Sequence, residues 1–116
     1  MFLSAVSALL AACGGDESKG DPAAVAAAEK VWTDKCVTCH GNRGMGDGPG
    51  AAPLNPKPRT FKDPKWQMQT KDDRIAKVIV EGGASVGLSA NMAPNPELAD
   101  KPEVVAELIK KIRSFR

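Results

Sequence analysis

Cys36-Val37-Thr38-Cys39-His40 is the most informative stretch of this 116-residue chain. Two thiols stand two residues apart, and an imidazole follows the second thiol directly. On a helical turn, residues with this spacing share one face, so both thiols and the imidazole can act on one ligand. His40 is the only histidine of the chain, and no other imidazole competes for its role. The stretch therefore predicts a single site that uses two thiols and one imidazole.

This C-x-x-C-H spacing is typical of the attachment site of c-type haem. Cys36 and Cys39 can each add to one haem vinyl group, and His40 can then bind the iron. A thioredoxin-like C-x-x-C needs a βαβ context and no adjacent histidine. A zinc site needs a fourth cysteine or histidine, which the sequence lacks outside its N-terminal segment. A structural disulfide beside a surface histidine stays open as an alternative, but we predict one covalent haem c.

The first twelve residues have the character of a signal peptide. Residues 1–12 contain ten apolar residues, too few to span a bilayer but enough for a signal-peptide core. The run ends in Leu10-Ala11-Ala12-Cys13, which resembles the lipobox of bacterial lipoproteins, where the cysteine carries the lipid. A buried cysteine after a hydrophobic helix is the alternative. We expect a signal peptide over 1–12, lipidation of Cys13, and a periplasmic or extracytoplasmic protein anchored to a bacterial membrane by lipid alone.

The remaining residues are numerous enough for one small domain only. Residues 13–20 are small and polar and predict a flexible tether, which leaves 21–116 as the folded domain. Aromatic residues make up only 4%, with no tyrosine, while nine prolines and eleven glycines indicate long loops. Such a thin core suggests that something besides side chains fills the interior. A net charge of +2 is too balanced for a nucleic-acid binder.

Apolar periodicity predicts three helices and almost no strand. The first begins at Asp21-Pro22, with Asp21 as the cap, and runs to about Lys35. The second follows the capping-box pattern Thr70-Lys71-Asp72-Asp73 and stops at Gly82-Gly83. The third begins between 100 and 103 and carries its apolar face to Phe115. The fold class expected is all-α.

Several landmarks follow one another in a recognisable order. They are Trp32 four residues before Cys36, the loop Gly44-Met45-Gly46-Asp47-Gly48-Pro49, a methionine followed by prolines, and a last helix ending Ile112-Arg113-Ser114-Phe115. Over residues 22–115 the chain thereby resembles the class I cytochromes c, which carry one haem between a histidine and a methionine. The resemblance implies that the first and last helices cross closely, that about three main helices wrap the haem, and that Trp32 lies against it.

Met45, Met68 and Met92 are the candidates for the sixth iron ligand, opposite His40. Met45 is only five residues from His40 and cannot easily cross to the other face. Met68 can equally be core filler, as any single methionine can. Met92 stands where the resemblance places the thioether ligand, so we assign it. A neutral thioether favours ferrous iron, which predicts a positive reduction potential and no vacant iron position.

The resemblance also implies supporting groups around the haem. The carbonyl of Pro49 would accept the proton on the outer nitrogen of His40 and fix its ring. Arg59 and Trp66 would donate to the haem propionates. An exposed cation at Arg59 and a packing aromatic at Trp66 are equally good interpretations from the residues alone.

The charges are segregated along the chain. Residues 57–77 hold seven cations and three anions, a local +4, whereas 78–109 hold one cation and five anions, a local −4. The positive side can steer the protein to an acidic redox partner, or it can be solvated loop charge without such a role.

We therefore predict a monomeric, non-enzymatic single-electron carrier that serves redox partner proteins and binds no nucleic acid. Two alternatives belong to other classes. One is a haem protein with a labile sixth iron position that binds a gas or acts on peroxide. The other is a haem-free structural or metal-binding lipoprotein, which would be colourless.

Overall fold

One continuous helical segment carries the cysteines and the histidine. In the computed structural model, which describes residues 20–116, it consists of α1 (Pro22–Val31), a π-helical turn (Trp32–Cys36) and α2 (Val37–His40). The Asp21 side chain accepts a hydrogen bond from the Ala23 amide, which confirms the predicted cap. The predicted end near Lys35 is wrong. The segment continues to Gly41, whose φ of 78° ends it in a conformation that favours glycine.

Three further α-helices follow, and residues 20–116 contain no strand, so the all-α prediction is confirmed. They are α3 (Pro64–Gln69), α4 (Asp72–Glu81) and α5 (Pro102–Ser114), with single 3-10 turns at Gly83–Val86 and Pro96–Leu98. Helix α3 was not predicted from the apolar periodicity. It begins on the same Asp-Pro signal as α1, because the Asp63 side chain accepts from the amides of Lys65 and Trp66.

The predicted capping box at the start of α4 is wrong. Thr70 closes α3 instead, since its amide donates to the carbonyl of Trp66, and Lys71 occupies the cap position of α4 without a side-chain bond. Asp72 and Asp73 still lie in the first turn, where negative charge complements the helix dipole. The short α3 therefore uses the threonine that the pattern assigned to the next helix.

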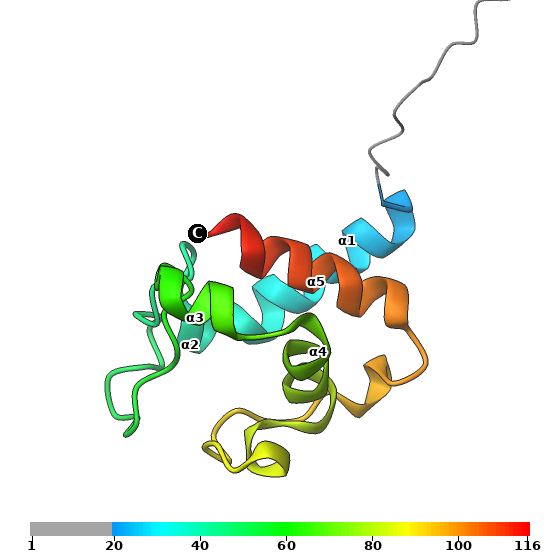
Figure 1. The fold of residues 1–116 in the computed structure, drawn as a ribbon. Coiled ribbons are helices and arrows are strands. Elements are labelled where there is room, and N and C mark those ends of the chain that lie inside the picture. The colour runs from blue at the N-terminus through cyan, green and yellow to red at the C-terminus, as the bar shows by residue number, and fades with distance from the viewer. Residues whose placement is uncertain (1–19) are drawn as a thin grey trace, which may run out of the picture.

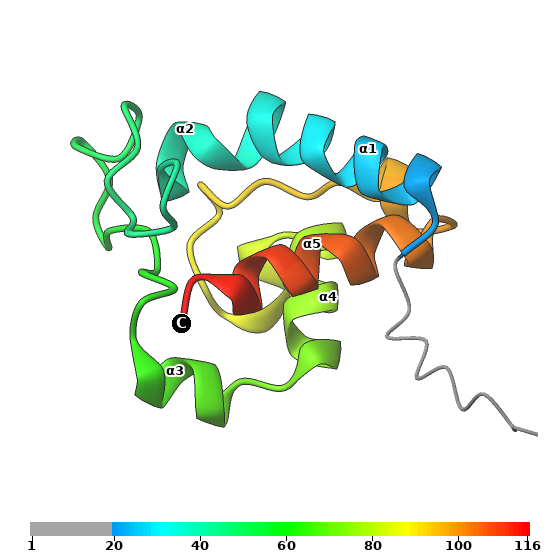
Figure 2. The same cartoon turned by 90° about the horizontal axis from the view of Figure 1, so that it is seen from above.

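The core lies where α1 and α5 cross. Helix α5 crosses in front of α1 in Figure 1 and lies next to it in Figure 2, and α4 packs against α5. Alanines on α1 allow the close approach, and Trp32 extends the contact toward the site. The buried residues at this centre are Ala24, Ala28, Trp32, Ile75, Ile79, Val104, Val105, Leu108 and Ile112. The crossing of the first and last helices is as predicted, while Val25 of α1 lies toward the surface and is 38% exposed.

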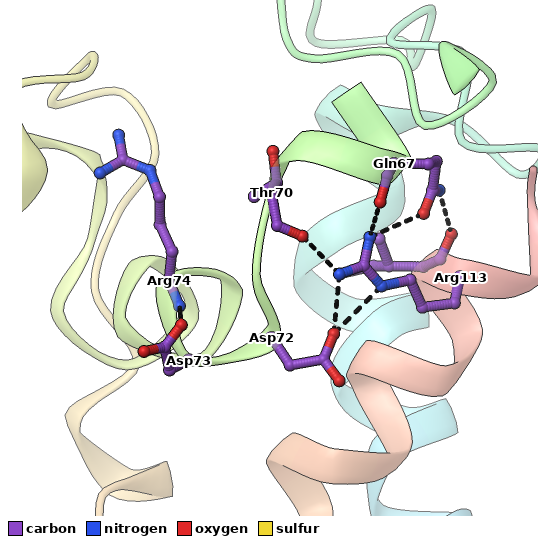
Figure 3. A network of polar contacts seen from close by, with 7 residues as sticks. Gln67, Thr70, Asp72, Asp73, Arg74 and Arg113 are labelled. Atoms are coloured by element: carbon purple, nitrogen blue, oxygen red, sulfur yellow. Dashed lines mark hydrogen bonds and ion pairs between the residues drawn. The ribbon is translucent and has the colours of Figure 1, made fainter. Parts of the chain in front are cut away.

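Arg113 fastens the end of α5 to the junction of α3 and α4 (Figure 3). Its guanidinium donates to the backbone and side-chain oxygens of Gln67 at 2.7 and 3.0 Å and to the Thr70 carbonyl at 2.6 Å. It also donates to the Asp72 carboxylate at 2.7 and 3.1 Å. The planar fork of an arginine suits this set of acceptors, which a lysine cannot match.

Replacing Arg113 is expected to lower the free energy of unfolding. Arg113→Met keeps most of the aliphatic stem but leaves the Gln67 and Thr70 carbonyls without their donor, at a cost of about 2–3 kcal/mol. Arg113→Lys should recover only part of the loss. Urea unfolding measures the change, with Arg116→Met as the control for an exposed terminal arginine. Equal midpoints for Arg113→Met and Arg116→Met would contradict the importance of this network.

Candidate functional site

The two thiols and the imidazole lie on one side of the first helical segment. Cys36 is the last residue of the π-helical turn, while Cys39 and His40 belong to α2. Both cysteines are free and half-buried, and His40 is half-buried as well. The positions differ by three and four residues, the spacing of neighbours on a helix surface. The structure thus brings the three predicted groups together.

Burial determines the protonation state of Cys36 and His40. It raises the pKa of the Cys36 thiol to about 11, with the nearby Lys35 opposing the shift. Cys36 is therefore a thiol at neutral pH and not the low-pKa thiolate of a disulfide oxidoreductase. Burial also lowers the pKa of His40, while its hydrogen bond to the Arg59 backbone acts the other way. The imidazole is then neutral at neutral pH, as a metal ligand must be.

A backbone carbonyl orients the His40 ring. Its Nδ1 lies 3.2 Å from the carbonyl oxygen of Arg59. A carbonyl only accepts, so Nδ1 carries the proton in this contact and Nε2 keeps the lone pair. The partner expected from the resemblance, the carbonyl of Pro49, is not used, and Pro49 is exposed. The chain instead returns beside the ring at 58–61, where the Pro58 carbonyl lies so near Gly46 that a Cβ there would meet it at 2.5 Å.

The glycine-rich loop closes the end of α2. The amides of Gly46, Gly48 and Gly50 donate to the carbonyls of His40, Cys39 and Thr38 at 2.9, 3.1 and 2.7 Å. These carbonyls are among the last of the helix, which have no partner within it. A Cβ on Gly48 would lie 2.3 Å from the Thr38 carbonyl oxygen, so the approach requires glycine. The loop therefore supports the turn that carries both Cys39 and His40.

Among the three candidate methionines, Met92 is the least exposed. Met45 is 47% exposed and Met68 82%, which makes core filling by Met68 wrong, whereas Met92 is half-buried. Backbone bonds fasten Met92 near the end of α4: its carbonyl accepts from Gly83 at 2.9 Å, and its amide donates to Ser89 at 3.2 Å. Its role as an iron ligand stays a prediction.

The other predicted residues are placed as follows. Trp32 is buried, with its ring 5.4 Å from that of Phe115. Trp66 is half-buried, and its ring lies 5.3 Å from that of Phe61. The Arg59 side chain is exposed and reaches Asp63 at 3.9 Å, a weak surface pair. Roles for these three side chains toward a haem remain predictions.

Phe61 is a site residue that no sequence motif predicted. Its ring is buried and stacks on the His40 ring, with centroids 4.6 Å apart. The two residues are 21 positions apart in the sequence, and no local pattern predicts their contact. The scarcity of aromatic residues was the one signal that could have drawn attention to it.

The donor set fits covalent haem better than a bare metal ion. In the part of the chain that the structure describes, no group of three or more His, Cys, Asp or Glu side chains could hold a metal ion. Two free thiols beside a neutral imidazole are instead the set that haem c attachment uses.

Comparison with known families decides the assignment. The model of the cytochrome c family matches residues 25–110. The chain belongs to the cytochrome c family. For this cytochrome c the match runs from α1 into α5 and includes Cys36, Cys39, His40 and Met92. Membership implies covalently bound haem c, haem-based electron transfer and redox partner proteins, rather than the turnover of a substrate.

A search for similar proteins and the lengths of the helices add two findings on this cytochrome c. No curated protein shows significant similarity to the chain. Within residues 20–116, every helix is too short or too polar to cross a membrane. The predicted signal peptide and Cys13 lie outside the described residues.

Proposed function

We propose that this cytochrome c is a single-electron carrier of class I, with one haem attached through Cys36 and Cys39 and the iron bound by His40 and Met92. The observation that carries the proposal is the state of His40. Its Nδ1 is held by the Arg59 carbonyl, which leaves Nε2 as the lone-pair nitrogen beside two free thiols. A histidine held in this way is typical of a metal ligand whose ring is oriented by a second group.

The residues of the chain have separate tasks in this proposal. Haem c supplies a one-electron couple between ferrous and ferric iron. Cys36 and Cys39 fix the group to one helical face, and the glycine-rich loop keeps that turn of helix closed. His40 and Met92 would both bind the iron, which would leave it no position for a substrate. Arg59 and Trp66 would donate to the haem propionates, and Trp32 would pack beside the group.

The proposal extends to location. Residues 1–12 would be removed as a signal peptide, Cys13 would carry the lipid, and 13–20 would tether the domain of residues 21–116. The carrier would then work as a monomer in the periplasm or outside the cytoplasm, in a respiratory or other redox chain. The apolar run that ends in Leu10-Ala11-Ala12-Cys13 supports this location.

Redox titration of the holoprotein tests the proposed function. We expect a single reversible transition of one electron per chain, with neither carbon monoxide binding to the reduced form nor peroxide turnover by the oxidised form. Rapid carbon monoxide binding or peroxide consumption would favour the alternative with a labile sixth position. A colourless protein made with the haem-maturation machinery present would contradict any haem function.

Unpaired basic residues near α3 support an acidic redox partner. Of the seven cations in 57–77, Arg59 and Lys77 have carboxylate partners, and Asp72 of the same segment is engaged by Arg113. The other five cations of residues 57–77 are exposed and have no ion pair within the described residues: Lys57, Lys62, Lys65, Lys71 and Arg74. Their charge is free to attract an anionic surface, although it is screened by salt.

Electron transfer to an anionic oxidant should depend on salt. We expect the oxidation rate by ferricyanide to fall about tenfold between low and high ionic strength, while the rate with a cationic cobalt complex rises or stays constant. Lys65→Glu should weaken the ferricyanide dependence. Lys30→Glu, with the same charge change on α1, should have a smaller effect. Flat stopped-flow profiles with both oxidants would contradict steering.

A further inference from the structure

Arg59 and Phe61, two residues apart in the sequence, hold the His40 ring from two directions. The Arg59 carbonyl lies 3.2 Å from Nδ1 and fixes the ring within its own plane. The Phe61 ring lies against the face of the imidazole, with centroids 4.6 Å apart and an angle of 20° between the planes. A hydrogen bond alone leaves the ring free to rock about the Nδ1 contact, and a stacked neighbour restricts that rotation.

Phe61 is itself fixed through its backbone. Its amide donates to the Gly44 carbonyl at 2.6 Å, and its own carbonyl accepts from the Gln67 side chain at 2.9 Å. Gln67 is 6% exposed and donates a second bond to the Ile112 carbonyl at 3.0 Å. Its oxygen accepts from the Arg113 guanidinium, as Figure 3 shows. Phe61 is therefore connected through buried bonds to the end of α5.

The Phe61 side chain also has little room to move. Trp66 lies on it at 5.3 Å between ring centroids, and Trp32 and Phe115 lie at 6.3 Å. Gly44 allows this packing, because a Cβ there would meet the Phe115 ring at 2.8 Å and the Phe61 ring at 3.0 Å. Close packing on several sides keeps the ring in one orientation. The face that Phe61 presents to His40 is thus set by the core.

We propose that Phe61 is a positioning residue for His40: with its backbone bonded to Gln67 and its ring packed in the aromatic core, it sets the plane of the imidazole that would bind the iron. The inference rests on the proposed function, since it concerns the same ligand. It adds a second constraint to the carbonyl bond and links the orientation of the ligand to the packing of α5.

Two-dimensional NMR of the reduced, diamagnetic wild-type holoprotein tests the contact without any substitution. We expect cross-peaks between the ring protons of Phe61 and those of His40. Their absence in a protein whose spectrum shows a histidine-ligated haem would overturn this inference while the proposed function stands. A protein without haem would overturn both.

Variants test the consequence for the oxidised protein, in which the shifts of the haem methyl protons depend on the plane of the axial histidine. Phe61→Leu should change the order or spread of these shifts, and Phe61→Tyr should restore the wild-type pattern. Phe115→Leu is the matched control, because it removes an equal ring from the same cluster without touching His40. It should lower stability and change the pattern less than Phe61→Leu does. A wild-type pattern in Phe61→Leu, or an equal change in Phe115→Leu, would overturn the inference.

Discussion

Cells that express the Cys36→Ala/Cys39→Ala double variant with the full haem-maturation machinery are expected to yield no covalently bound haem. Both thiols are free and half-buried on the face that carries His40, and their spacing is that of haem c attachment. Without them, no other cysteine remains within residues 20–116. A denaturing gel stained for haem measures the loss, and intact mass confirms one haem per wild-type chain. Each single variant should keep at most one of the two bonds.

The third cysteine offers a control with the same chemical change. Cys13→Ala should keep its haem and lose membrane association, because the proposed role of Cys13 is to carry lipid. Covalent haem in the double variant would contradict attachment at Cys36 and Cys39. Loss of haem in Cys13→Ala would show that the cysteines had been assigned to the wrong tasks.

Met92→Ala is expected to produce the second large effect, an iron with an open or weakly held sixth position. The reduced variant should bind carbon monoxide rapidly, and the oxidised variant should gain high-spin character. The reduction potential should fall on the order of 0.1 V, because the thioether no longer favours ferrous iron. Absorption spectroscopy and redox titration give all three readings.

Met45→Ala and Met68→Ala are the matched controls for this experiment. Both side chains are more exposed than that of Met92, and Met68 is 82% exposed. Neither substitution should alter the spin state or the potential. If Met68→Ala or Met45→Ala opens the iron and Met92→Ala does not, the assignment of the sixth ligand is wrong.

Local signals predicted the helical fold well. Asp21-Pro22 begins α1 as expected, and the apolar stripe of α5 is buried at Val105, Leu108 and Ile112. The same Asp-Pro signal at Asp63 was overlooked because the six-residue α3 is too short to show an apolar period. That omission also caused the error at Thr70, which ends α3 instead of starting α4.

The reactive groups of the site were predictable from the sequence, whereas the residues that orient His40 were not. The thiols and His40 can be recognised from their spacing alone, because they lie within five residues of sequence. The partner of His40 is a backbone carbonyl at Arg59, nineteen residues away, and every residue has such a carbonyl. Only the folded loop decides which one is used, and the analogy that favoured Pro49 failed for that reason. Phe61 and Gln67 were missed on the same ground, because their contacts depend on the tertiary fold.

The most direct test of the account is the absorption spectrum of the mature holoprotein in its oxidised and reduced forms. Covalent haem bound by His40 and Met92 predicts sharp low-spin bands of c-type haem on reduction and the weak far-red sulfur-to-iron band on oxidation. A high-spin spectrum, or sharp bands without the sulfur feature, would contradict ligation by Met92 and the closed electron carrier. A colourless protein would contradict haem binding by the Cys36–His40 stretch altogether.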